Sequence, residues 1–275
     1  MNSNWSVGRT TKQMQIKSGA WGVESPNRIE DRRTDAVRSG DPGRTVRPGR
    51  RDAFAPELSQ SACSSRGLSR LIYHDYRRYR ATGARSAISV IALTQGFWAS
   101  AVFRFFHWAL DHCSWSGLRA IVNAVSILCQ KFVEVFTGIS IPATCNIGPG
   151  LYIGHFSGIF IDSGCRVGEN CNLAQGVTIG KGGRAELRGV PTLGDRVHVG
   201  AGALILGGIT IGNDAVIGPG AVVMNSVPPC GVAMGNPARV VGLDGSFELV
   251  HYDNMESDPG RKLALQDKLA GTHQT

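Results

Sequence analysis

The residue best suited to chemistry in this chain is a histidine at an interruption of a regular pattern. His155 lies in the segment Gly154-His155-Phe156-Ser157-Gly158, directly before the two-residue insertion Ile159-Phe160. It follows the inward-facing Ile153 by two positions, so its side chain should leave the interior. An imidazole has an ordinary pKa near 6.5 and can take the proton of an attacking hydroxyl at pH 7. We expect any chemistry to lie at this break of the repeat; the alternative for His155 is an ordinary surface histidine.

A second interruption, the loop from Lys181 to Thr192, completes the candidate site. Counting one turn of the repeat plus the insertion places Gln175 over His155, and a further turn plus the loop places Asp195 over Gln175. The pattern therefore predicts a polar column on one face. Backbone N–H groups freed at such breaks can stabilise an oxyanion. The sequence places that role only in the neighbourhood of Gly180 to Gly183.

Apart from these breaks, an aliphatic residue recurs at every sixth position, and that period predicts the fold. Thirteen positions are Ile, Leu or Val, and the next residue is Gly after eight of them. A six-residue unit supplies one short strand and one corner, so three units close a triangular coil of about 18 residues. The pattern predicts a parallel β-helix of four to five coils, because strands in an ordinary sheet alternate with period two and helices with 3.6. The positions are Ile141, Ile147, Ile153, Ile161, Val167, Leu173, Ile179, Leu193, Val199, Ile205, Ile211, Ile217 and Val223.

The remaining segments are organised around this prism. Residues 1–66 are rich in Arg, Ser, Gly, Asp and Pro without apolar periodicity, and we expect a disordered basic tail. Residues 67–137 are predicted to be an α-helical region, and residues 138–242 the β-helix domain. Residues 243–275 are a C-terminal extension whose pattern we do not interpret. The expected helices cover 69–80, 87–112 and 116–136.

Charge argues against one class of partner. The tail holds twelve Lys or Arg against seven Asp or Glu, a net of +5 out of the chain's +8, which leaves +3 for the rest. A nucleic-acid footprint needs a basic face on the folded part, so no nucleic-acid partner is predicted. The N-terminus lacks the apolar run of a signal peptide, and we expect a cytoplasmic protein.

Membrane contact is an alternative that the helical region leaves open. The stretch from Ile88 to Phe103 carries no charge but is interrupted by Gln95 and Gly96, which favours a helix buried against a partner over a membrane span. Peripheral contact through aromatic side chains is not predicted. Those side chains are Phe97, Trp98, Phe103, Phe105, Phe106 and Trp108.

Seven cysteines raise the question of a metal or a disulfide. Cys145, Cys165 and Cys171 fall at the small corner position of the repeat, where a thiol acts as a small hydrophobe. No pair has CxxC spacing, and the odd count favours a reducing compartment. Only His155 and His198 lie on the prism, whereas a zinc site of the β-helix type needs three imidazoles. We predict no metal.

Four features together resemble the serine acetyltransferase group of hexapeptide acyltransferases. They are the repeat, the Gly-His-Phe-Ser-Gly segment, the run from Gln175 to Gly180 and the closing Gly235-Asn236-Pro237-Ala238-Arg239. The resemblance covers about Leu68 to Gly242. It implies a left-handed parallel β-helix, a homotrimer or a multiple of three, and acetyl-CoA as acyl donor in the groove between neighbouring prisms. It also implies that His155 matches the family's catalytic base.

The resemblance also implies where the cofactor lies. Small residues let the pantetheine arm approach, and Arg239 is a candidate partner for a phosphate. Ordinary prism packing is the alternative for each of the small residues. The expected cofactor-binding residues are Gly180, Gly182, Gly183, Ala201, Gly202, Ala203, Gly220, Ala221 and Arg239.

The positions that hold the acceptor depart from the family. Members that act on serine have an Asp fifteen residues before the catalytic His and another directly before it; here these positions are Ser140, which can accept a hydrogen bond from the imidazole, and Gly154. The family's Arg-His pair in the loop becomes Gly189-Val190, with Arg188 one step earlier as a substitute. By a weaker alignment, an acidic residue of the helical region becomes Ala81. The charged groups of serine need such partners, so the acceptor is open.

Three functions follow from these observations. The first is acetyl transfer from acetyl-CoA to the hydroxyl of L-serine, a step of cysteine biosynthesis. The second is O-acetylation of a sugar hydroxyl in surface polysaccharide synthesis, which a less charged pocket would suit. The third is a non-catalytic β-helix scaffold, which the histidine at a repeat break disfavours.

Overall fold

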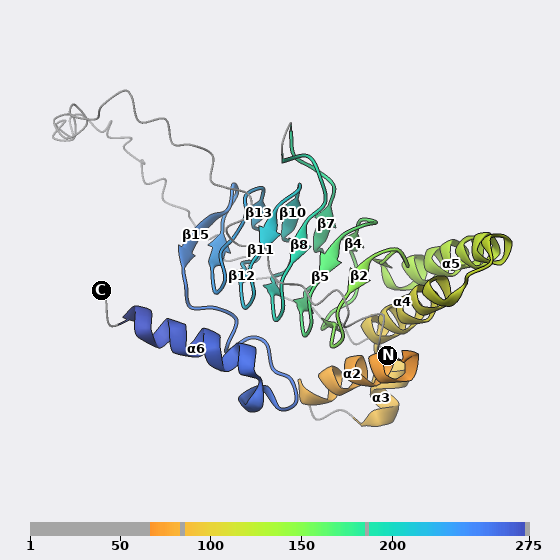
Figure 1. The fold of residues 1–275 in the computed structure, drawn as a ribbon, viewed down its shortest axis with the longest axis horizontal. Helices are drawn as coiled ribbons and strands as arrows, with labels where there is room; N and C mark the ends of the chain where they lie inside the picture. The colour runs from red at the N-terminus through yellow and green to blue at the C-terminus, as the bar shows by residue number, and fades with distance from the viewer. Residues whose placement is uncertain (1–66, 83–85, 185–186, 273–275) are drawn as a thin grey trace, which may run out of the picture. The chain divides into compact units, whose positions relative to one another are not determined.

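The computed structural model describes residues 67–82, 86–184 and 187–272, and the expected tail at 1–66 lies outside these ranges. Within them, short strands wind into the three flat faces of a parallel β-helix (Figure 1). Sheet A contains β1 (Ile139–Ser140), β4 (Ile159–Ile161), β7 (Thr178–Gly180), β10 (Leu204–Leu206) and β13 (Val222–Val223). Sheet B contains β2 (Asn146–Ile147), β5 (Arg166–Val167), β8 (Thr192–Leu193) and β11 (Thr210–Ile211). Sheet C contains β3 (Tyr152–Ile153), β6 (Asn172–Leu173), β9 (His198–Val199), β12 (Val216–Ile217), β14 (Val232–Met234) and the antiparallel β15 (Arg239–Gly242).

The hexapeptide aliphatics fill the interior of the prism. All thirteen predicted positions are buried, and the most exposed of them, Ile141, shows only 5% of its surface. Cys145, Cys165 and Cys171 are fully buried at the corners, as predicted. One period of six therefore determines both the strand positions and the core.

Two insertions set the register between coils. Residues of β3 pair with β6 at an offset of twenty, Ile153 with Leu173, because the first coil carries two extra residues. Residues of β6 pair with β9 at an offset of twenty-six, Leu173 with Val199, because the loop ahead of β8 adds eight. Later coils return to eighteen, as in His198 with Val216.

The helical region precedes the prism and contains one helix more than predicted. Its helices are α2 (Leu68–Ala81), α3 (Ala87–Leu93), α4 (Gln95–His112) and α5 (Ser116–Thr137). The single helix expected over 87–112 is wrong, since the chain turns by 76° between α3 and α4. Thr94 is extended there, and the turn lets Gly96 lie directly against Ile153, where a Cβ would stand 2.6 Å from the carbonyl oxygen of Ile153.

A buried ion pair fastens this region to the first coil. Asp75 of α2 accepts hydrogen bonds from Arg104 of α4 at 2.9 and 3.1 Å, and from the backbone N–H groups of Gly150 and Leu151 at 2.8 and 3.1 Å. Arg104 in turn donates to the carbonyl oxygens of Ile147 and Gly148. The carboxylate thus joins two helices to the corner ahead of β3.

The C-terminal extension is ordered against sheet C and includes η2 (Met255–Ser257) and α6 (Pro259–Thr272). Ser246 and Val250 are fully buried, and Asn172 donates to the carbonyl of Leu249 at 3.0 Å. Arg196 makes a bidentate pair with Asp214 at 2.9 Å and lies 3.6 Å from Asp258 of the extension. The extension, which the sequence left uninterpreted, therefore covers one face of the prism.

Candidate functional site

His155 lies on the corner that joins sheet C to sheet A in the first coil. The chain leaves β3 at Ile153 and enters β4 at Ile159, and all four residues from His155 to Gly158 are exposed. Ser157 has φ 89° and Gly158 has φ 69°, so the extra residues bulge out of the coil. The predicted outward direction of His155 is confirmed by this exposure.

The start of the prism packs against the same segment. Gly138 ends α5 with φ 66°, and a Cβ there would stand 2.9 Å from the Cα of Ser157. Only glycine fits both the left-handed backbone and the close approach. The end of α5 therefore fixes the position of the histidine segment.

Residues at the C–A corner of successive coils stack into a column. Backbone hydrogen bonds make Ser157, Gln175 and Ala201 equivalent in successive coils, because the N–H of Gly176 donates to the carbonyl of Ser157 and that of Gly202 to the carbonyl of Gln175. The place of Gln175 over His155 stays a prediction, and Ala201, not Asp195, lies beside Gln175. The predicted place of Asp195 is wrong because the loop adds eight residues rather than two. Asp195 belongs to the corner between sheets B and C, where it accepts from the N–H of Glu169 at 2.8 Å.

Glycines make one edge of this column accessible. Gly176, Gly202 and Gly220 all have φ between 64° and 72°, and they link successive coils through N–H bonds to the carbonyls of Ser157, Gln175 and Ala201. A Cβ on Gly202 or Gly220 would meet no atom within 4 Å. An extended ligand can therefore lie along this edge against backbone.

The expected cofactor residues divide into four groups. Gly202 and Gly220 border the open edge together with the partly exposed Ala201, whereas Ala203 and Ala221 point into the core and are fully buried. Arg239 is exposed at the far end of the same corner, beside a cavity of about 170 Å³. The first coil, which carries His155, and the fifth, which carries Arg239, are four strand spacings apart, which is roughly 19 Å.

The fourth group lies in the loop at the opposite edge of sheet A. Gly180 ends β7, and the loop folds back on itself through paired hydrogen bonds of 3.0 Å between Gly182 and Gly189. Arg188 and Gly183 are exposed on it. Within one chain, sheet A separates this loop from His155, so the structure does not bring Arg188 and His155 to one corner.

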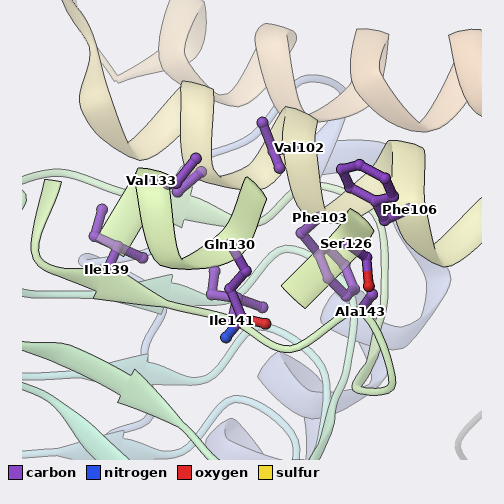
Figure 2. Close-up of a pocket in the computed structure, with 10 residues that line it drawn as sticks. Val102, Phe103, Phe106, Ser126, Gln130, Val133, Ile139, Ile141 and Ala143 are labelled. Carbon is purple, nitrogen blue, oxygen red and sulfur yellow. The ribbon is translucent and has the colours of Figure 1, made fainter. Parts of the chain in front are cut away.

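Ser140 is held from the α5 side. It lies in β1, is 4% exposed, and accepts a hydrogen bond from Gln130 of α5 at 3.2 Å. Gln130, Ile139 and Ile141 are among the residues that line a small cavity of about 10 Å³ between α4, α5 and the first coil (Figure 2). A hydrogen bond between Ser140 and His155 stays a prediction.

An aromatic cluster stands where the family carries an aspartate. A Cβ on Gly154 would lie 3.1 Å from the ring of Tyr152, and this ring packs on Tyr79 with centroids 4.9 Å apart. The hydroxyl oxygen of Tyr79 accepts a hydrogen bond from the backbone N–H of Ile153 in β3 at 3.2 Å. Burial raises the pKa of the Tyr79 phenol, so it stays protonated. Sequence reasoning missed Tyr152, whose only signal was a glycine at the aspartate position.

The buried cysteines and His198 take no visible part in the site. Burial raises the pKa of the Cys145 and Cys171 thiols to about 12 and that of Cys165 to about 11, which keeps them protonated and unreactive. Desolvation lowers the pKa of His198, which lies on sheet C. Among the described residues, no group of three or more His, Cys, Asp or Glu side chains is placed to hold a metal ion.

Known proteins share this arrangement. The family described as bacterial transferase hexapeptide (six repeats) matches residues 191–225. A serine acetyltransferase of Mycobacterium tuberculosis is 36% identical over 165 residues, which cover 60% of this chain and 69% of that protein. The chain belongs to the serine acetyltransferase family. The predicted fold class, a left-handed parallel β-helix preceded by an α-helical region, is confirmed with it.

Solved structures of serine acetyltransferases agree. Soybean serine acetyltransferase complexed with serine superposes with a TM-score of 0.57 at 30% identity, covering 66% of this chain and 72% of that chain. The enzyme of Brucella abortus strain S19 in complex with coenzyme A gives a TM-score of 0.56 at 28% identity, covering 63% and 67%. The chain spans about two thirds of the length of these relatives. Membership makes this chain an acyltransferase, as predicted.

Proposed function

We propose that this serine acetyltransferase family member transfers the acetyl group of acetyl-CoA to the hydroxyl of L-serine, with His155 as the general base. The observation that carries the proposal is the continuous open edge from His155 past Gln175, Gly202 and Gly220 to Arg239. It gives an elongated thioester a path against backbone, with an exposed imidazole at one end and a guanidinium at the other. The family supplies the chemistry, since relatives were solved with serine and with coenzyme A.

The reaction needs one proton carrier. The imidazole of His155 takes the proton of the acceptor hydroxyl as its oxygen attacks the thioester carbonyl. The resulting tetrahedral oxyanion is stabilised by backbone N–H groups at the breaks, and it collapses with loss of the thiolate. The imidazolium then returns the proton to the thiolate, so His155 ends as it began.

The donor site is completed by a second copy of the chain. The loop that carries Gly180, Gly182, Gly183 and Arg188 lies across sheet A from His155 in one protomer. Packing of prisms side by side brings the loop of one copy to the C–A corner of the next. A homotrimer closes this arrangement with each copy in the same role.

A second acceptor class is favoured by the surroundings of Gly154. Tyr152 fills the space of the family's aspartate, and Phe156 beside His155 is 49% exposed. An aromatic, uncharged pocket suits the ring of a sugar better than the ammonium group of serine. O-acetylation of a sugar hydroxyl is therefore the alternative function.

An acceptor panel tests the choice. Thiol release from acetyl-CoA is followed with L-serine, D-serine and free hexoses as acceptors, and the acetylated product is identified by mass. Saturable release with L-serine and not with D-serine supports the main proposal. Thiol release with a hexose and not with serine supports the sugar reaction instead of the main proposal. If none of these acceptors gives thiol release, both proposed functions are contradicted.

A further inference from the structure

A cavity of about 320 Å³ lies between α2, the first two coils and the C-terminal extension, and the proposed function does not use it. Its walls are formed by α2, by the corners ahead of β3 and β6, and by the chain around η2 that leads into α6. Figure 1 shows the blue extension returning to the orange α2 at this point. Pockets for small molecules measure about 300 to 1,000 Å³, so this cavity suits a ligand of about the size of a sugar phosphate.

Arg78 of α2 lines this cavity and is only 2% exposed. Its Nε donates to the carbonyl oxygen of Gly150 at 3.0 Å, and its Nη2 donates to the carbonyl oxygen of Asn170 at 3.3 Å and to the side-chain oxygen of Asn172. Its Nη1 is buried and has no hydrogen-bond partner among the residues that the structure describes. A buried N–H group without an acceptor is costly, so an acceptor is expected at this atom.

The charge of Arg78 also lacks a counter-ion within the described part of the chain. Its acceptors are neutral oxygens, whereas the buried guanidinium groups of Arg104 and Arg196 each pair with an aspartate. Burial lowers the pKa of Arg78 to about 10, which still leaves the side chain charged at pH 7. A buried cation is stabilised by an anion, and the planar guanidinium group matches the oxygens of a phosphate or a carboxylate.

Three carboxylates also line the cavity, and each of them already has a partner. Asp253 pairs with Arg77, which joins the extension to α2. Asp258 accepts hydrogen bonds from the hydroxyl of Tyr252 and from two backbone N–H groups of its own segment. Glu169 has an interaction partner as well. Of the two arginines in the lining, the one whose charge is unmatched by these carboxylates is therefore Arg78.

We propose that this cavity binds a small organic anion, with one phosphate or carboxylate group at Arg78 and a hydroxyl-bearing body of about hexose size in the rest of the space. The amide side chains of Asn170 and Asn254 and the hydroxyl of Ser257 line the cavity. Such groups donate to and accept from the hydroxyl groups of a sugar. The anion occupies the position that the unpartnered Nη1 of Arg78 leaves open, and the polar side chains hold the body.

This site is distinct from the catalytic corner. The corners ahead of β3 and β6 join sheet B to sheet C, whereas His155 lies where the chain passes from sheet C to sheet A. Sheet C therefore separates the anion from the edge proposed for acetyl-CoA. Binding at the cavity can be measured without turnover, so this proposal and the proposed function fail separately.

The first test compares charged and neutral sugars as probes. Isothermal titration calorimetry of the full chain is run with glucose 6-phosphate, with glucuronate and with neutral glucose. Saturable heat with glucose 6-phosphate alone assigns the anion as a phosphate, and saturable heat with glucuronate alone assigns it as a carboxylate. Glucose should bind more weakly than either by about tenfold or more, because it cannot form the charge-assisted bond to Arg78. Binding of neither anion at millimolar concentration, or equal affinity for glucose, overturns the proposal.

The second test places the bound anion in this cavity. Arg78→Gln removes the charge, and Ser257→Trp fills the space from an exposed position of the extension while keeping every hydrogen bond of Arg78. Both should weaken binding of the anion by about tenfold or more, and Ser257→Trp decides the outcome if Arg78→Gln does not fold. The control Arg239→Gln removes an exposed guanidinium at the donor edge and should leave the affinity unchanged. Wild-type affinity in Ser257→Trp, or loss of binding in Arg239→Gln, overturns the proposal.

Discussion

Loss of the Asp75 carboxylate should weaken the whole protein more than its single charge suggests. Asp75 is 1% exposed and accepts four hydrogen bonds, two from Arg104 and two from the backbone of Gly150 and Leu151. In Asp75→Asn the amide places an N–H donor against one of these donors and leaves Arg104 without its counter-charge. Breaking one side of a buried pair costs about 3 to 5 kcal/mol.

The structure places the expected cost near the lower end of that range. Arg104 keeps the carbonyl oxygens of Ile147 and Gly148 as acceptors, so part of its charge remains stabilised. We expect a loss of about 3 kcal/mol, which lowers the melting temperature by about 6 to 12 °C for a folded part of this size. The control is Asp253→Asn, which removes an ion pair on the surface. The side chains of Asp253 and its partner Arg77 are each 38% exposed, so loss of this pair should cost about 1 kcal/mol or less.

Urea unfolding followed by circular dichroism measures both variants. A lower midpoint at constant slope reports a change in stability alone. Adding Arg104→Met to Asp75→Asn should recover part of the loss, because the uncompensated buried charge is removed. A cost for Asp75→Asn equal to that of Asp253→Asn would refute the reasoning.

Three further outcomes follow from the structure. Burial lowers the pKa of His198, so the unfolded chain binds more protons, and stability should fall as the pH drops below 6.5, the ordinary pKa of histidine. His198→Asn should flatten this pH dependence in melting curves recorded at pH 7 and 5.5. An unchanged pH dependence in the variant would contradict this explanation. Gly138→Ala should reduce both stability, by about 1 kcal/mol or more, and turnover, because its Cβ meets Ser157 at 2.9 Å; wild-type turnover would show that the segment of His155 is not set by this contact. Removal of residues 1–62 should leave the melting temperature and the specific activity unchanged, because that composition buries little apolar surface, and a loss of activity alone would make the tail a working part.

The prism could be predicted from the sequence because its rule is local and repeated. Each six-residue unit carries one Ile, Leu or Val at the position that faces the interior, and all thirteen of these positions proved to be buried. The exposure of His155 followed from the same counting, whereas the place of Gln175 over it stays a prediction. Asp195 was misplaced because the length of an inserted loop has to be known before a later coil can be aligned.

Contacts between distant segments could not be predicted in this way. Nothing in the pattern of α2 shows that Asp75 caps the N–H groups of Gly150 and Leu151, since the pairing depends on how the helices meet the first coil. The turn at Thr94 likewise follows from the fit of Gly96 on Ile153 rather than from helix propensity alone. Tyr152 took the space beside Gly154 for a similar reason, through its packing on Tyr79.

The central claim is that His155 carries the proton in acetyl transfer, and its replacement by alanine tests this most directly. Thiol release from acetyl-CoA is measured at saturating acceptor for His155→Ala and for the control His112→Ala. His112 is exposed, and among the described residues its ring is hydrogen-bonded only to the carbonyl oxygen of Trp108 in the same helix. General-base catalysis contributes about 10² to 10⁴ in rate, so kcat should fall by that factor in His155→Ala alone, at unchanged melting temperature. Turnover of His155→Ala within a few-fold of the wild type would contradict the account.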